Sequence, residues 1–184
     1  MTNNETLKAI KNRRSIRKFK DNQITKEELN AIVQSAIYAP TGHNDQPWHF
    51  TIIQNKEVLN KISEVANEAM KNSEIEWISK LGSKNRPLFY NAPTVVIVSG
   101  KEGTYSPLTD CSAAIQNMLI AAESLNIGSL WNGLVSYFFE NKEEAKVLNL
   151  KEGYKPYYAV ALGYKDCEAP IAPERNEDVF TYIL

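Results

Sequence analysis

The chain has 184 residues, a net charge of −1, 43% hydrophobic residues and 23% charged residues. These values are ordinary for a soluble globular protein and give no sign of a disordered chain. At this length we expect residues 1–184 to form one domain, which buries about 70% of the surface of its unfolded chain.

The sequence gives no support for membrane or metal chemistry. No apolar run approaches the ~20 residues that cross a bilayer, and the N-terminus lacks the apolar stretch of a secretion signal. We therefore expect a cytoplasmic protein with no membrane partner. The cysteines Cys111 and Cys167 lie far apart and form no C-x-x-C motif, so we expect no metal site.

The first predicted element is a short helix over residues 2–12, in which Leu7 and Ile10 are expected to point inward. It leads into a stretch from Lys8 to Lys20 that holds seven basic residues and no acid. Because the whole chain has a net charge of −1, subtracting these seven leaves −8 on the remainder. An anion is expected to bind here: a nucleic-acid backbone, a membrane surface or the phosphate of a small cofactor.

The apolar residues within this stretch favour the small phosphate. Ile16 and Phe19 interrupt the charges at spacings that let one side of the segment pack, whereas nucleic acid and membranes prefer an extended basic face. Arg13 and Arg17 supply rigid donor forks, and Ser15 adds a hydroxyl between them. A solvated basic surface remains the alternative for this stretch alone.

The rest of the chain mixes helices and strands. Thr25 and Glu28 form a capping box that opens a helix ending near Pro40. Helical spacing also predicts helices at 56–70, from 107 onward and at 141–150. β-branched and aromatic runs predict strands at 48–54, 94–99, 127–131 and 156–162, while 72–90 gives no clear pattern. The fold class is therefore α+β, with one sheet layered by helices.

The loop between the second helix and the first strand is the second stretch with candidate chemistry. It reads APTGHNDQPWHF from Ala39 to Phe50. Short amide and hydroxyl side chains on such a turn can present donors and acceptors to a flat heterocycle, and Gly42 permits close approach of the backbone. An ordinary connecting loop is the alternative. No P-loop or G-x-G-x-x-G motif is present, so neither of these phosphate-binding folds is expected.

Together, these stretches resemble the nitroreductase family of FMN-dependent oxidoreductases. R-R-S-I-R at 13–17 is followed by A-P-T-G-x-N-x-Q-P-W-x-F from Ala39, as in that family. Further similar blocks follow in order across nearly the whole chain. They lie at Asn91 to Val98, Asp110 to Ala122, Ile127 to Gly133, Ala159 to Tyr164 and Pro173 to Arg175.

The resemblance implies a set of FMN-binding residues. Arg13, Ser15 and Arg175 match residues that hold the phosphate and ribityl chain, and Arg14 contributes through its backbone or at the phosphate rim. Arg17 matches a basic residue at the pyrimidine edge of the ring. The remaining matched positions hold the ring itself: Pro40, Thr41, Gly42, Asn44 and Gln46 in the loop, and Leu130, Trp131, Asn132 and Gly133, whose backbone N–H groups reach N5 and O4. Asn132 stands where many relatives carry Glu.

The same resemblance implies an intertwined homodimer with two FMN sites at its interface. The central sheet would be mainly antiparallel and extended by the C-terminal segment of the partner, a role that the apolar end of the tail, 180–184, suits. The implied reaction oxidises NADH or NADPH and passes electrons to a small electron-poor acceptor by a ping-pong route. No catalytic side chain is assigned, because hydride transfer needs stacking near N5 rather than an acid or base.

If FMN binds here, Arg17 is expected to affect the reduction potential of the flavin. Reduction of a flavin by two electrons leaves negative charge at N1 and O2, so a fixed cation raises the potential, and about 30 mV corresponds to ~1.4 kcal/mol. Nitroaromatics, quinones, enones and free flavin are candidate acceptors. The alternatives are a specialised reaction such as reductive dehalogenation or flavin breakdown, a flavin-holding protein without turnover, or a nucleic-acid-binding module.

Overall fold

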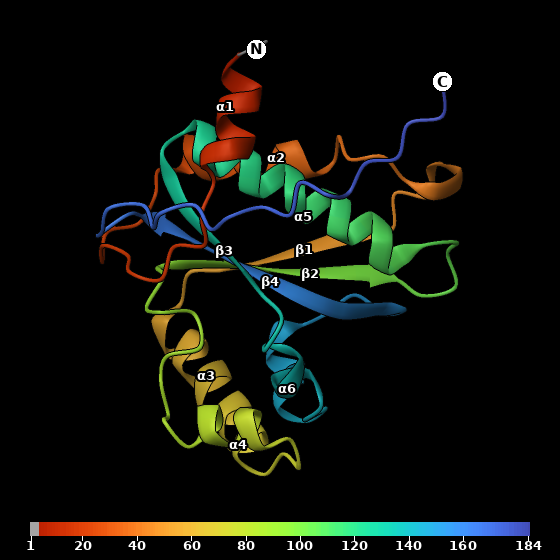
Figure 1. The fold of residues 1–184 in the computed structure, drawn as a ribbon. Coiled ribbons are helices and arrows are strands. Elements are labelled where there is room, and N and C mark those ends of the chain that lie inside the picture. The colour runs from red at the N-terminus through yellow and green to blue at the C-terminus, as the bar shows by residue number, and fades with distance from the viewer. Residues whose placement is uncertain (1–3) are drawn as a thin grey trace.

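A four-stranded antiparallel sheet forms the middle of the molecule in the computed structural model, which describes residues 4–184 (Figure 1). Its strands are β1 (Trp48–Ile53), β2 (Thr94–Lys101), β3 (Ile127–Asn132) and β4 (Tyr154–Tyr164). The spatial order is β1-β2-β4-β3, which leaves β1 and β3 at the two edges. The central strand β2 is buried from Thr94 to Gly100, as its continuous β-branched run predicts. The expectation of an antiparallel sheet in an α+β fold is confirmed.

Two helices, α2 (Lys26–Ala36) and α5 (Pro107–Ser124), cover one face of this sheet, and α1 (Glu5–Asn12) packs against α5 (Figure 1). The apolar stripes of α2 and α5 pack on alternate residues of β2 and β4, including Val96, Val98 and Leu162. Small residues on α5, such as Ala114, let the helices approach closely.

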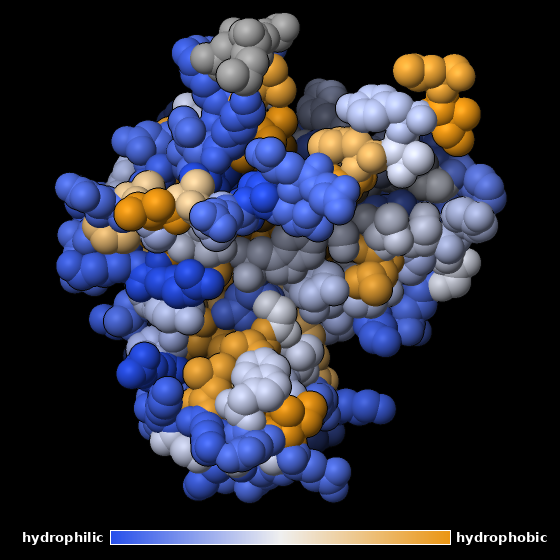
Figure 2. Space-filling view, in the orientation of Figure 1, coloured by the Kyte–Doolittle hydropathy of each residue, from blue (hydrophilic) through white to orange (hydrophobic). Residues whose placement is uncertain are grey.

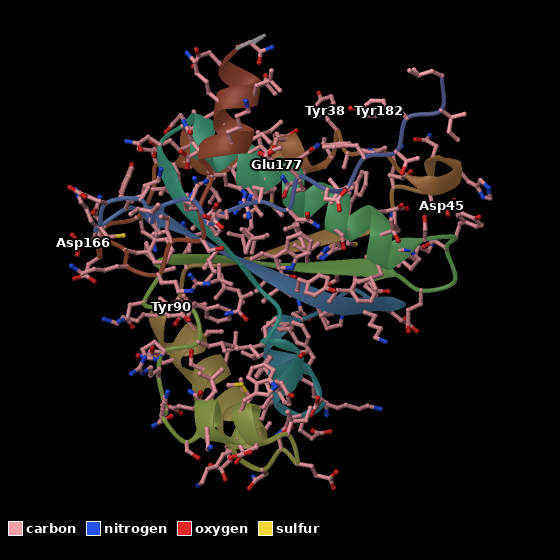
Figure 3. All side chains as sticks on the ribbon, viewed as in Figure 1. Tyr38, Asp45, Tyr90, Asp166, Glu177 and Tyr182 are labelled. Carbon is pink, nitrogen blue, oxygen red and sulfur yellow. The ribbon has the colours of Figure 1, made fainter. Side chains whose placement is uncertain are left out.

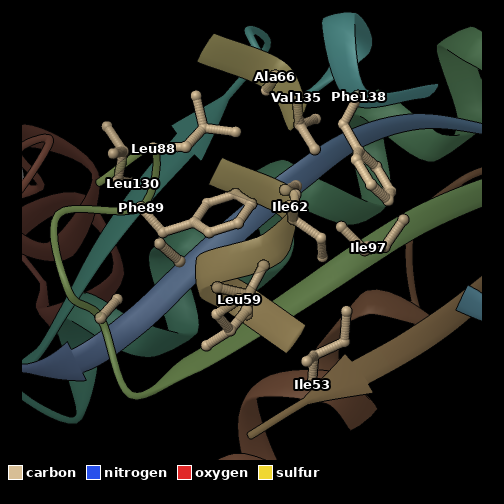
Figure 4. Packing of buried hydrophobic residues seen from close by; sticks show 14 of the residues in the cluster. Ile53, Leu59, Ile62, Ala66, Leu88, Phe89, Ile97, Leu130, Val135 and Phe138 are labelled. Atoms are coloured by element: carbon tan, nitrogen blue, oxygen red, sulfur yellow. The ribbon is translucent and has the colours of Figure 1, made fainter. Parts of the chain in front are cut away.

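The opposite face carries α3 (Lys56–Lys71), α4 (Glu76–Gly82) and α6 (Ser136–Phe139), with 3-10 turns at Gly42–Asn44 and Glu144–Leu148 elsewhere in the chain. Figure 4 shows how Ile62 and Phe138 meet Ile97 of the sheet. Successive strand residues point to opposite faces, so the two apolar clusters share the same four strands.

Most predicted elements are present within a few residues of their expected bounds. The capping box is formed in full, because Glu28 N–H donates to Thr25 Oγ1 at 3.2 Å and Thr25 N–H donates to Glu28 Oε2 at 2.8 Å. The predicted helix over 2–12 is present as α1 from Glu5, and its first residues lie outside the described range. Ile10 was expected to point inward and instead is 47% exposed, since Ala9 occupies the buried face of α1.

The predicted helix at 141–150 is wrong. The structure forms only the 3-10 turn Glu144–Leu148, which ends where Asn149 adopts a left-handed φ of 44°. Leu148 is its one buried residue, so little packing energy is available to extend the helix. The 72–90 stretch, which gave no pattern, contains α4.

Two terminal segments complete the fold. The N-terminal segment after α1 lies along the outer edge of β3, where Ser15 forms a parallel bridge with Ser129. Every residue of the tail 166–184 is exposed in the protomer. The last residues project from the body as an apolar end in Figure 2. No helix formed by residues 4–184 is long and apolar enough to pass through a bilayer.

Candidate functional site

The basic segment is fixed beside β3 by its apolar residues. Ile16 is 1% exposed, and its N–H donates to Ser129 O at 3.0 Å. Phe19 is also buried and bridges to Lys165, which follows β4. Packing at these two positions holds the backbone of the intervening residues against the sheet edge. The interpretation of the segment as a packed element rather than a free basic surface is therefore supported by its burial.

The charges of this segment have different partners. Among residues 4–184, neither Arg13 nor Arg17 forms a salt bridge with a carboxylate. Lys18 instead pairs with Asp166 at 2.9 Å, and this hydrogen bond raises the pKa of the lysine. The guanidinium groups of Arg13 and Arg17 thus remain available to an anion from outside the protomer.

The Arg14 side chain donates its hydrogen bonds to backbone carbonyl groups. One terminal nitrogen donates to Lys11 O at 2.7 Å and Arg13 O at 2.8 Å, while Nε donates to Pro170 O at 3.2 Å. Its side chain consequently ties the end of α1 to the start of the C-terminal tail. A direct contact between this guanidinium and a phosphate would require these bonds to break, which leaves the backbone of Arg14 as its available group.

Arg17 lies beside an aromatic ring that the sequence did not single out. Its guanidinium carbon is 6.0 Å from the centroid of Tyr90, and its NH1 donates weakly to Ser15 O at 3.4 Å. Tyr90 follows Leu88 and Phe89, which are both buried, and it adopts a left-handed φ of 55°. The buried pair therefore anchors a turn that directs Tyr90 toward Arg17.

The exit of β3 presents backbone groups at the same edge. Ser129 directs its carbonyl toward Ile16, so Trp131, two residues later, directs its backbone to this side as well. Leu130 points into the core, and the Trp131 ring packs edge-on against Tyr158 with centroids 5.2 Å apart. The edge of β3 next to the basic segment thus presents backbone N–H and C=O groups.

Asn132 and Gly133 end this strand in different ways. Asn132 is buried; its Nδ2 donates to Leu88 O at 2.8 Å and its Oδ1 accepts from Val135 N–H at 3.0 Å. The amide side chain is therefore structural and leaves only its backbone for other contacts. Gly133 is exposed, and a Cβ added there would meet nothing closer than Tyr158 at 3.9 Å. Its backbone is open to approach.

An open hollow of about 560 Å³ lies beside Gly133. Its walls come from the start of α5, from α6 and from the first half of β4, and they include Phe139, Lys155 and Tyr157. Burial raises the pKa of Tyr157, so its hydroxyl stays protonated over a wider pH range. Within residues 4–184, no group of three His, Cys, Asp or Glu side chains is arranged to hold a metal ion.

The loop that follows α2 has an unusual backbone and packs on the start of α5. His43, Asn44 and Gln46 all have positive φ values, between 44° and 58°. Inside the loop, Gln46 N–H donates to Thr41 Oγ1 at 3.3 Å and Gln46 Nε2 donates to Asn44 Oδ1 at 3.0 Å. Gly42 N–H donates to Asp110 Oδ1 at 3.3 Å. Pro40 is exposed at the entry to this loop.

The loop and the basic segment lie at opposite ends of one protomer. Figure 3 places Asp45 of the loop at the right and Asp166, the partner of Lys18, at the left. Tyr90, beside Arg17, lies on the left as well. The structure thus brings Arg13, Ser15 and Arg17 together with β3, but it does not bring the loop to them. Arg175 lies in the exposed tail and forms no salt bridge among the described residues.

Two residues in these regions were missed by the sequence reasoning about sites. Tyr90 ends a stretch without a clear pattern, and only its position shortly before a central strand could have drawn attention to it. Asp110 stands out in the sequence only as the first residue of a family-like block, and its contact with Gly42 joins segments 68 positions apart. Such long-range pairs leave no periodic signal in a single sequence.

Comparisons with known proteins point to one family. The family model described as "Nitroreductase family" matches residues 10–164. A relative from Archaeoglobus fulgidus, provisionally named an NADH dehydrogenase/NAD(P)H nitroreductase, is 34% identical over 165 residues, which cover 87% of this chain and 85% of the relative.

Two solved structures are similar over the full fold. A nitroreductase with bound FMN from Bacteroides fragilis is 34% identical, with a TM-score of 0.89, and the match covers 99% of this chain and 100% of that one. A nitroreductase with bound FMN from Desulfitobacterium hafniense is 32% identical with a TM-score of 0.89, and both chains are covered completely. The family match over most of the chain, together with these similarities, shows that the protein belongs to the nitroreductase family.

Proposed function

We propose that this protein is an FMN-dependent oxidoreductase that takes hydride from NADH or NADPH and reduces a small electron-poor acceptor. The observation that carries the proposal is the placement of Arg13, Ser15 and Arg17 along the open edge of β3, ahead of Gly133. Arg13 and Arg17 have no carboxylate partner in the described part of the chain, and they lie beside a strand edge with polar backbone groups. Such a surface fits a ligand with a phosphate and a ring bearing acceptor atoms. Relatives named as FMN-bound nitroreductases support this choice of ligand.

The phosphate end would be held by side chains near the start of the chain. Arg13 and the Ser15 hydroxyl supply donors, and Arg175 from the tail adds a second guanidinium. Charge-assisted hydrogen bonds of this kind contribute roughly 1.5–3 kcal/mol each, which is enough to retain a cofactor without a covalent link. Arg14 would contribute its backbone, because its side chain binds three carbonyl groups.

The ring would be held by Arg17 and residues 130–133 of one protomer and by the loop 40–46 of another. Arg17 would contact the pyrimidine edge of the ring, and the backbone of 130–133 would supply donors to its other polar edge. The loop residues Pro40, Thr41, Gly42, Asn44 and Gln46 come from a second copy of the chain, because the loop and Arg17 lie at opposite ends of one protomer. FMN, when bound, accepts a hydride from the nicotinamide and gives its electrons to the acceptor.

A homodimer is therefore part of the proposal. β1 is an edge strand, and the exposed tail ends in residues of high β propensity, Val179 to Leu184. We propose that the tail of one protomer adds to the sheet of the other, and that residues 1–184 form one FMN-binding domain. A cytoplasmic location, where reduced nicotinamides are available, completes this assignment.

The acceptor belongs to a broad class under this proposal. Nitroaromatics, quinones, enones and free flavin are all electron-poor and flat enough to stack on the ring. The hollow beside Gly133, with Phe139 and Tyr157 in its walls, offers aromatic surface for such a molecule. Reductive dehalogenation or flavin breakdown remains the alternative reaction for the same framework.

One optical experiment tests the function. Freshly purified protein is expected to be yellow, to release FMN on heating, and to bleach when NADH or NADPH is added under argon. Turnover of a nitrofuran or menadione then identifies the acceptor class, and negligible rates with both would favour the alternative reaction. A preparation that stays colourless after incubation with excess FMN would overturn the proposal.

A further inference from the structure

Two aspartates link the loop 40–46 to the segment that begins α5, and they do so in opposite directions. Gly42 N–H of the loop donates to Asp110 Oδ1 at 3.3 Å. Tyr105 N–H, just ahead of α5, donates to Asp45 Oδ2 of the loop at 2.9 Å. Each segment thus supplies one carboxylate and one backbone donor, and the two segments are joined at both ends of their contact.

The same two segments are also in direct van der Waals contact. A Cβ added to Gly42 would lie 2.7 Å from Ser106 Oγ and 2.8 Å from Tyr105 Cδ1, so a larger residue would displace one of these side chains. The rings of His43 and Tyr105 have centroids 4.5 Å apart. The loop is therefore seated on the start of α5 by contacts as well as by hydrogen bonds.

The backbone of the loop needs such support. His43, Asn44 and Gln46 have left-handed φ values of 52°, 58° and 44°, a region that disfavours residues with a side chain. Inside the loop, the two hydrogen bonds that involve side chains are exposed to water, and Asp45 N–H donates to Gly42 O at 3.0 Å. Contacts with the segment ahead of α5 add to these bonds in keeping the shape of the loop.

Asp110 is unusual among the carboxylates because it is only 4% exposed. Its Oδ1 accepts from both Gly42 N–H and the Ser106 hydroxyl, the latter at 2.9 Å, while Oδ2 has no hydrogen-bond partner within the described chain. Its place in the first turn of an 18-residue helix favours a negative charge. Burial of a carboxylate is costly, and the hydrogen bonds from Gly42 N–H and the Ser106 hydroxyl offset part of that cost.

We propose that Asp110 is a positioning residue which, together with Asp45, fixes the loop 40–46 in the shape that holds the flavin ring. This inference rests on the proposed function, because it assigns Asp110 a role in the site formed by that loop. Asp110 does not touch the cofactor; it acts through the backbone of Gly42.

The test compares FMN binding by the full-length protein and three variants. Asp110→Ala removes the acceptor of Gly42, Asp110→Asn keeps an oxygen at that position, and Asp45→Ala removes the exposed half of the link. FMN affinity is measured by fluorescence quenching, and the visible spectrum of the bound flavin is recorded at saturation. Asn67→Ala is the control, since it removes one hydrogen bond of a buried side chain, to Arg86 O, on α3.

Asp110→Ala and Asp45→Ala are expected to weaken FMN binding by roughly tenfold or more, the range for losing a hydrogen bond to a charged group. Both should also shift the flavin spectrum, and Asp110→Asn should restore most of the affinity. Asn67→Ala should lower the Tm and leave affinity and spectrum unchanged. If both alanine variants bind FMN with wild-type affinity and spectrum, Asp110 is merely structural and the inference fails.

The two proposals fail in different ways. A wild-type protein that binds no FMN would overturn the proposed function before any variant is made. A wild-type protein that binds FMN normally, with alanine variants that match it, would overturn only the role of Asp110. If Asp110→Ala does not fold, Asp45→Ala decides the question, because its side chain is exposed and its removal leaves the core intact.

Discussion

The Arg17 guanidinium lies 6.0 Å from the centre of the Tyr90 ring, in a contact between the N-terminal segment and the turn ahead of β2. Within residues 4–184, the Arg17 side chain makes one hydrogen bond, a long one to Ser15 O at 3.4 Å. The ring therefore restricts where the cation can lie without neutralising it. A cation that is positioned but unpaired suits a role in the electrostatics of a bound ring.

Arg17→Gln is expected to lower the two-electron midpoint potential of bound FMN, because the reduced flavin loses a neighbouring cation. A loss of ~1–2 kcal/mol of stabilisation corresponds to about 20–45 mV for this couple. Spectroelectrochemical titration measures the shift. Arg17→Lys should recover part of it, and Tyr90→Leu should give a smaller change because the charge remains. An unchanged potential in Arg17→Gln would contradict the electronic role.

Asn132→Ala is expected to destabilise the fold by roughly 2–4 kcal/mol, since it leaves Leu88 O and Val135 N–H buried without their partners. Urea denaturation of the apoprotein measures the change. Asn141→Ala is the matched control, because the Asn141 side chain caps Glu144 N–H at an exposed position and should cost under about 1 kcal/mol. Equal losses in the two variants would mean that burial does not set the cost.

The contrast between these asparagines illustrates what sequence patterns can and cannot predict. The capping box at Thr25 and the apolar run of β2 are local signals, so element type and rough bounds follow from them. The role of Asn132 depends on Leu88, from a different part of the chain, and no spacing rule links the two. For the same reason, positions such as Arg175 and Asn132 are implied only by the family resemblance, whereas Arg13, Ser15 and Arg17 also stand out by their chemistry.

In the candidate site, too, some features follow from local sequence and others depend on distant segments of the chain. The segment around Ser15 was correctly expected to pack on one side, because Ile16 and Phe19 carry that information locally. The diversion of the Arg14 side chain to Pro170 O could not be predicted, since it depends on where the tail leaves the sheet. The separation of the loop from Arg17 within a protomer is likewise a consequence of topology.

Tyr164→Phe is expected to remove a pH-dependent contribution to stability. The Tyr164 hydroxyl donates to Glu28 Oε2 at 2.6 Å, which lowers the pKa of Glu28 and raises the pKa of Tyr164. Because the pKa of Glu28 is lowered in the folded protein, its carboxylate stabilises the fold at pH values above its ordinary pKa near 4.5. This stabilisation is lost as the pH falls through the pKa that Glu28 has in the folded protein. Because the pKa of Tyr164 is raised in the folded protein, its protonated hydroxyl stabilises the fold at pH values below its ordinary pKa near 10. This stabilisation is lost as the pH rises through the pKa that Tyr164 has in the folded protein.

The difference in unfolding free energy between wild type and Tyr164→Phe should thus be largest between about pH 6 and 9 and shrink toward both ends. Urea titrations at a series of pH values measure it. Tyr154→Phe serves as the control, since no hydrogen bond of the Tyr154 hydroxyl is seen within the described residues. A difference that stays constant from pH 3 to 11 would show that the contact is not linked to either titration.

Deletion of residues 179–184 is expected to convert the proposed homodimer toward monomer and to weaken FMN binding. The segment carries Phe180, Ile183 and Leu184, which are at least 71% exposed in the protomer and gain burial only against another surface. Removing them should also uncover the edge of β1 in the partner. Because the proposed site uses the loop of one copy and Arg17 of the other, dissociation should release flavin in parallel.

Sedimentation velocity over a range of protein concentrations, with absorbance recorded for both protein and flavin, measures the two effects together. Phe180→Ser with Ile183→Ser is the companion variant, since it keeps the chain length and removes only apolar surface. Asn176→Ala, at a polar position of the same tail, should behave as wild type. A truncated protein that remains a dimer with wild-type FMN affinity would rule out exchange of the tail between subunits, whereas monomers that retain FMN would instead rule out a site shared by two copies.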